Sequence, residues 1–184
     1  MPDDRSRRPR KPRPLDPARL EELALAYVAR FATSEAKLEA YLVRKIRERG
    51  WDGERSADPS AIARRFVDLG YLEDEAYART KSGGLLRRGY GPRRVAQALN
   101  ADGIAAELRE EIRADKGEER RAAIALAARR RLGPWGPPSD RDLRQKQLAA
   151  MLRAGHGFDA ARAVIEAPSI DAAEQWAAEP EETP

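Results

Sequence analysis

The stretch that decides the fold covers residues 71–104 and reads YLEDEAYARTKSGGLLRRGYGPRRVAQALNADGI. It predicts two helices joined by a tight turn. Asp74 suits the N-cap of the first helix, because its carboxylate can accept a free backbone amide. Gly89 marks the end of that helix, and Pro92 begins the second, where proline lacks only an N–H that would have no helical partner. We therefore predict a helical hairpin whose turn is the R-R-G-Y-G-P-R-R segment.

Basic side chains gather around this turn, and no acidic residue occurs between positions 76 and 101. Arginine forks onto phosphates and carboxylates, and a neighbouring tyrosine offers a surface for stacking. We predict that the hairpin binds an anionic partner. The alternative is that the arginines complete a solvated helix surface or pair with acids of a neighbouring repeat. The predicted binding residues here are Lys81, Arg87, Arg88, Tyr90, Arg93 and Arg94.

The motif Y-L-x-D-E-x-Y-A, followed by R-R-G-Y-G-P-R-R-V-x-x-x-L-x-x-x-G-I, resembles the central motif of the bacterial RecX regulatory proteins. One departure is the pair Gly83-Gly84 inside the first helix, because each glycine costs about 1 kcal/mol relative to alanine. We expect that helix to be bent or frayed at its middle. The resemblance implies tandem three-helix repeats and a role in recombination, DNA repair and the SOS response.

Apolar positions recur at equal intervals outside the motif. Three groups follow the order apolar, apolar, helix end, and the third has glycines beside its end: Leu42, Ile46 and Gly50; Val95, Leu99 and Gly103; Leu148, Leu152 and His156. Such a period indicates stacked repeats in which no unit buries its apolar stripe alone. The alternative is that the similarity arises by chance, since apolar residues four positions apart occur on any amphipathic helix.

The predicted fold is all-α, an elongated array of three tandem three-helix repeats. Alanine, leucine, arginine and glutamate dominate the chain and favour helices, and no long β-branched run predicts a sheet. The predicted division is a disordered basic arm at 1–14, repeats at 15–72, 73–115 and 116–168, and an acidic mobile tail at 169–184.

A second basic group lies on both sides of the proline-rich turn at residues 133–140, offset there only by Asp140 and Asp142. Its predicted binding residues are Arg129, Arg130, Arg131, Arg144 and Lys146. The first repeat has basic residues at 44–49 instead, but Glu48 lies among them, and such mixed charges are typical of a solvated face.

Composition and motifs narrow the class of protein. Its 184 residues carry a net charge of +4, which favours acidic partners, and include no cysteine, which excludes disulfides and thiolate metal sites. No phosphate-binding loop, dinucleotide motif or zinc-protease motif is present, and the single histidine, His156, is better explained by a turn. No apolar run approaches the roughly 20 residues of a membrane helix. We expect a cytoplasmic monomer that is not an enzyme and needs no cofactor or metal.

The sequence is compatible with two functions. The resemblance implies a regulator that binds the RecA recombinase filament on single-stranded DNA and inhibits its ATPase, strand-exchange and co-protease activities. The alternative is a helical protein that binds nucleic acid directly, without recombinase. Against a sequence-reading helix, only Gln97 and Asn100 offer base-reading side chains on the second helix of the hairpin. A general helical-repeat adaptor would not need the basic hairpin.

Overall fold

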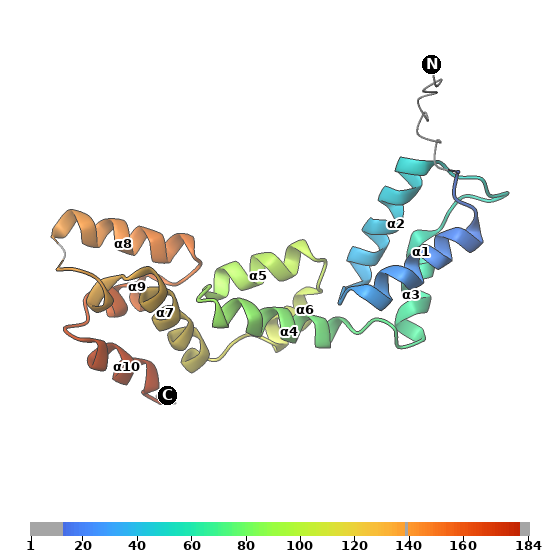
Figure 1. Ribbon diagram of the computed structural model, residues 1–184. Coiled ribbons are helices and arrows are strands. Elements are labelled where there is room, and N and C mark those ends of the chain that lie inside the picture. The colour runs from blue at the N-terminus through green and yellow to red at the C-terminus, as the bar shows by residue number, and fades with distance from the viewer. Residues whose placement is uncertain (1–12, 139, 181–184) are drawn as a thin grey trace, which may run out of the picture. The chain divides into compact units, whose positions relative to one another are not determined.

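The computed structural model describes residues 13–138 and 140–180, and these residues form α-helices, one short 3₁₀ helix and no β-strand (Figure 1). The predicted all-α class is confirmed. The chain divides into two compact units, Met1–Glu73 and Asp74–Pro184. No helix within the described ranges is both long and apolar enough to cross a membrane.

The described part of the first unit contains α1 (Pro17–Arg30), α2 (Glu35–Arg49) and α3 (Pro59–Asp68). Each helix begins after a side chain that accepts a backbone amide three residues later: Asp16, Ser34 and Asp58. The helices surround a core of buried aliphatic residues and Phe66. An isolated bridge joins Leu15 to Trp51 and ties the chain before α1 to the loop after α2.

The second unit begins with α4 (Asp74–Arg87), α5 (Pro92–Ala101) and α6 (Ala106–Glu111). The second helix of the hairpin begins at Pro92 as predicted, whereas Asp74, the predicted N-cap of the first, is the first residue of α4 itself. Helix α4 continues through Gly83 and Gly84, so the glycine pair does not end the helix. Leu85, Leu86, Val95 and Leu99 are buried between the two helices of the hairpin and hold it closed.

The rest of the second unit contains α7 (Lys116–Arg130), the 3₁₀ helix η1 (Gly133–Trp135), α8 (Arg141–Arg153), α9 (Phe158–Ile165) and α10 (Ile170–Ala178). A capping box starts α7: Asp115 accepts the Glu118 amide, and the Glu118 side chain accepts the Asp115 amide. Leu126, Met151 and Val164 come from α7, α8 and α9 and are fully buried in one core.

Each predicted repeat range contains three α-helices, but the exact division stays a prediction, because the second compact unit holds the helices of both later ranges. Residues 1–12 of the predicted arm and 181–184 of the predicted tail lie outside the described residues.

The structure differs from the predicted mobile tail at residues 170–178, which form α10. Ser169 caps this helix, and the small side chains of Ala173 and Ala177 are buried where α10 packs against α7. Arg120 of α7 donates to the carbonyls of Trp176 and Glu179, at 3.0 and 3.1 Å. The acidic composition of this segment does not prevent folding, because its acidic residues lie on the exposed side.

Candidate partner-binding surface

The turn between α4 and α5 is built by two glycines with different requirements. Gly89 has φ +78°, a left-handed conformation that glycine adopts without a steric penalty. Gly91 has φ −78° and ψ 169°, an extended conformation that any residue can adopt. The reason for glycine at position 91 is therefore a close contact rather than the local backbone.

That contact is with residues 154–156, the turn that follows α8. The Gly91 amide donates to the Ala154 carbonyl at 2.9 Å, and the Arg93 amide donates to the Gly155 carbonyl at 3.2 Å. A Cβ at Gly91 would lie 2.4 Å from the Gly155 carbonyl carbon and from the His156 nitrogen. A Cβ at Gly155 would lie 2.5 Å from the Arg94 nitrogen. We call this docking of residues 89–94 on residues 154–156 the junction; Figure 1 shows the start of α5 beside the end of α8.

His156 completes the junction from a buried position, with 1% of its surface exposed. Its Nε2–H donates to the Gly89 carbonyl at 3.0 Å, because a carbonyl can only accept. Burial lowers the pKa of His156 below its ordinary value, although the hydrogen bond to Gly89 acts in the opposite direction. The imidazole is therefore neutral at physiological pH. The sequence placed His156 in a turn, but carried no signal that would pair it with Gly89.

Four exposed arginines lie in the junction or directly before it, and we call them the turn arginines: Arg87, Arg88, Arg93 and Arg94. Among the described residues, no carboxylate lies within ion-pair distance of any of them. Arg93 and Arg94 also lie in the first turn of α5, at the positive end of the helix dipole. The structure thus keeps their charges in solvent and available for an anionic group.

Lys81 and Tyr90 contact other parts of the second unit, and the binding role predicted for them stays a prediction. Lys81 forms an ion pair with Asp102, which also accepts from the Tyr77 hydroxyl. Asp102 is one residue beyond the acid-free stretch, and the loop after α5 brings it back to α4. Tyr90 is half-buried and packs against the core of α4–α6. Lys81 and Tyr90 therefore support the hairpin, through an ion pair and through core packing respectively.

The second basic group is exposed throughout but divides into two parts. Arg129 and Arg130 end α7, and Arg131 follows with φ 54°. A Cβ at Gly89 would lie 2.6 Å from the Leu126 nitrogen, so the turn contacts α7 about one helical turn before Arg129 and Arg130. Arg144 and Lys146 lie in the first half of α8, and Arg144 is about 13 Å along the helix from its end. They lie apart from the junction.

Arg153 is a basic residue that sequence reasoning missed. It is exposed in the last turn of α8, immediately before the residues that accept the Gly91 and Arg93 amides. Its position beside the turn arginines depends on a contact between residues about sixty positions apart, which no local pattern reveals. The assignment of all these residues to a binding role stays a prediction.

The successive sets of three helices define an all-α protein of the helical-repeat class. The regulatory protein RecX of Myxococcus xanthus is 35% identical to this chain over 176 residues, which cover 90% of this chain and 94% of the relative. The chain belongs to the RecX family of regulatory proteins. Members of this family are not enzymes, so the predicted absence of catalytic activity holds for this chain.

Further comparisons agree with this assignment. A family model described as RecX, second three-helix domain, matches residues 74–112, which hold the hairpin and α6. The regulatory protein RecX of Stenotrophomonas maltophilia is 31% identical over 160 residues, covering 86% of this chain and 88% of the relative. The crystal structure of RecX from Lactobacillus salivarius matches with a TM-score of 0.61 at 19% identity, over 87% of this chain and 95% of that one. This likeness shows that the two proteins share a fold.

Proposed function

We propose that this protein binds the RecA recombinase filament on single-stranded DNA and thereby inhibits ATP hydrolysis, strand exchange and co-protease activity. Membership of the RecX family supports recombinase as the partner. The observation that carries the proposal is the set of turn arginines, which are exposed, lack an ion-pair partner among the described residues, and lie on a backbone fixed by the junction.

The junction matters for affinity because it fixes the backbone that holds these arginines before any partner arrives. Two backbone hydrogen bonds and the His156 hydrogen bond hold residues 89–93 in place. A preorganised group loses less conformational freedom on binding than one that must first be ordered. Arginine can then form paired hydrogen bonds with phosphate or carboxylate oxygens.

Inhibition would follow from occupancy rather than from any reaction of this protein. A ligand that prefers one conformation of an assembly shifts the population toward it by its difference in affinity. Bound to the filament, the protein would disfavour the conformation that hydrolyses ATP and exchanges strands. Inhibition should therefore saturate with concentration, reverse on removal of the protein and weaken as salt screens the arginines.

The test measures binding to a labelled single-stranded oligonucleotide, to free recombinase and to the assembled filament, each at several salt concentrations, together with filament ATPase activity. We expect the filament to be preferred and its ATPase activity to fall. Equal affinity for the filament and the naked oligonucleotide, without any loss of ATPase activity, would favour direct nucleic-acid binding. Unchanged recombinase activity at low salt with saturating protein would refute the proposal.

A matched pair of variants assigns the effect to the hairpin. Arg93→Gln with Arg94→Gln removes two charges beside the junction, and Arg47→Gln with Arg64→Gln removes two exposed charges from the first unit. Only the first pair should weaken binding to the filament. If both pairs weaken it equally, the interaction depends on net charge and not on the hairpin.

A further inference from the structure

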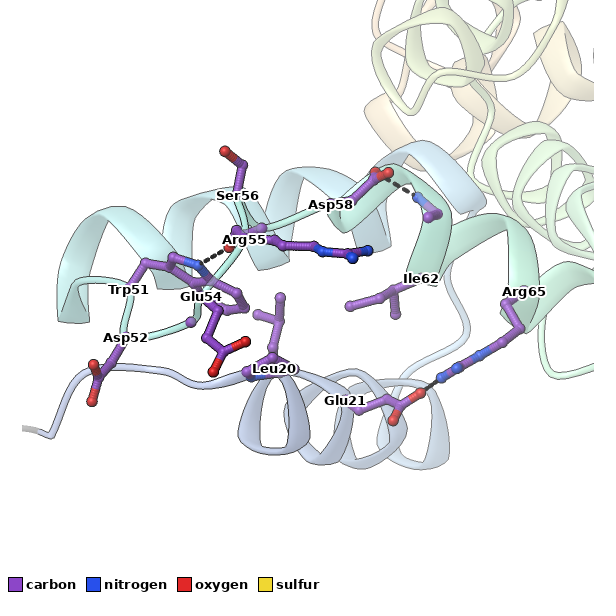
Figure 2. Close-up of a pocket in the computed structure, with 14 residues that line it drawn as sticks. Leu20, Glu21, Trp51, Asp52, Glu54, Arg55, Ser56, Asp58, Ile62 and Arg65 are labelled. Carbon is purple, nitrogen blue, oxygen red and sulfur yellow. Dashed lines mark hydrogen bonds and ion pairs between the residues drawn. The ribbon is translucent and has the colours of Figure 1, made fainter.

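A groove of about 690 Å³ in the first unit lies between α1, α3 and the loop that follows α2 (Figure 2). Its residues lie outside the hairpin, and the function proposed above does not use it. Three features decide what it would bind: an apolar floor, a rigid aromatic wall and an acidic rim.

The floor is formed by aliphatic side chains that come from facing helices. Leu20 of α1 is buried beneath the groove, and Ile62 of α3 is partly exposed at its side. Figure 2 shows the Leu20 side chain beside the Trp51 ring and Ile62 across from them, on α3. Ala57 and Ala61 are small enough to leave this surface open. An apolar side chain entering the groove would therefore exchange water for hydrocarbon contacts.

Trp51 forms a wall that is already in place. Its backbone is tied to the chain before α1, since the Leu15 amide donates to the Gly50 carbonyl at 2.9 Å and the Asp52 amide donates to the Leu15 carbonyl at 2.8 Å. Its indole Nε1–H donates to the Arg55 carbonyl at 2.7 Å. A Cβ at Gly53 would lie 2.6 Å from the ring, so the loop backbone packs directly against it. The ring cannot move far without breaking these contacts.

The rim is negative, in a chain whose net charge is +4. Four carboxylates and two arginines line the groove, and the Arg65–Glu21 ion pair neutralises one of each. Asp58 accepts the Ala61 amide as the cap of α3. Asp52 and Glu54 are exposed and form no ion pair among the described residues, which leaves Arg55 as the remaining positive group on the rim.

We propose that this groove binds a basic segment of a partner protein, with an apolar side chain packed beside Trp51 and lysine or arginine beside Asp52 and Glu54. An aromatic side chain beside an apolar pocket is a common anchor in protein interfaces. Opposite charges at the rim would guide the segment into place. The same carboxylates repel phosphate, so the groove does not suit nucleic acid. This proposal does not depend on recombinase binding.

The test uses the full-length protein with Trp135→Phe and Trp176→Phe, so that Trp51 is the only tryptophan and its emission reports the groove. The probe is a short synthetic peptide of lysine and leucine. The comparison probes are a glutamate–leucine peptide, a lysine–glycine peptide and a single-stranded oligonucleotide of similar length. We expect a saturable change in Trp51 emission with the lysine–leucine peptide and a weaker response to each of the others.

Matched variants separate the rim from general electrostatics. Asp52→Asn with Glu54→Gln should weaken the peptide about tenfold, which corresponds to about 1.4 kcal/mol. The control Glu22→Gln with Asp68→Asn removes two exposed charges outside the groove and should change the affinity less than about twofold, within the range of exposed charge effects. Equal losses in the two variants, no response of Trp51, or tighter binding of the glutamate peptide or the oligonucleotide would overturn the proposal.

Discussion

Replacing Gly91 with alanine tests the central feature of the second unit, because the added Cβ would meet only backbone atoms. It would lie 2.4 Å from the Gly155 carbonyl carbon, 2.4 Å from the His156 nitrogen and 2.5 Å from the Gly155 oxygen. Backbone cannot move aside as a flexible side chain can. Since the Gly91 conformation is extended, alanine adds no local strain, and the whole effect should come from separating the two sides of the junction.

The size of the effect follows from the interactions that must loosen. Overpacking costs about 1–3 kcal/mol in general. The displacement would also weaken the Gly91 and Arg93 amide bonds and the His156 bond, each of which contributes about 1 kcal/mol net. Partial relaxation would keep the loss below the full sum, so we expect a decrease of about 3–4 kcal/mol in the free energy of unfolding. That is a large part of the roughly 5–15 kcal/mol typical of a domain.

The assay is urea unfolding followed by fluorescence in a Trp51→Phe background, in which Trp135 and Trp176 both report on the second unit. Gly157→Ala is the matched control: a Cβ there would meet nothing within 4 Å, and φ is −70°. It should cost less than about 1 kcal/mol, the loss expected when alanine replaces glycine at an N-cap. If Gly91→Ala costs no more than Gly157→Ala, the junction does not stabilise the protein as described.

Three further outcomes are expected. Changing all four turn arginines to glutamine should weaken filament binding and leave the circular dichroism spectrum unchanged. The slope of log affinity against log salt concentration should become shallower by about one for each phosphate that the variant no longer binds. Unchanged affinity at moderate salt would mean that the arginines only form a solvated surface. Burial holds the pKa of His156 below 6.5, so the unfolded chain binds more protons than the folded chain as the pH falls. The free energy of unfolding should therefore be constant above about pH 6.5 and decrease below it. His156→Asn should reduce this decrease, and an equal decrease would contradict the buried, neutral state of His156. Burial and the Asp102 carboxylate raise the pKa of Tyr77 to about 12, so Asp102→Asn should lower the midpoint of its ultraviolet titration, and an unchanged midpoint would show that Asp102 has no part in the shift.

Local sequence was sufficient for most of the fold. Helix starts depend on side chains within three residues, as at Asp16, Ser34 and Asp58, and the ends of the hairpin follow from Gly89 and Pro92. Composition was a poorer guide for residues 170–178. Their acidic character predicted mobility, but helix α10 is held by small buried alanines and by Arg120, whose partners are more than fifty residues away.

The candidate surface was only partly predictable. Exposure of the turn arginines followed from a local excess of positive charge, whereas the pairing of Lys81 with Asp102 depends on how the loop after α5 returns to α4. Gly91 is the clearest limit. The sequence indicates that Gly91 lies in a turn, but glycine is needed there because the Gly155 backbone packs against it. A contact between residues so far apart produces no repeating pattern in the sequence.

The junction also has a consequence for the order in which the protein matures during synthesis. The Gly89 carbonyl and the amides of Gly91 and Arg93 find their partners only in residues 154–156. Until residues 154–156 have been synthesised, these groups have only water as a partner. The arginine-bearing turn would therefore reach its final form late, after the end of α8 has left the exit tunnel, so a nascent or prematurely terminated chain would carry the arginines without the framework that positions them.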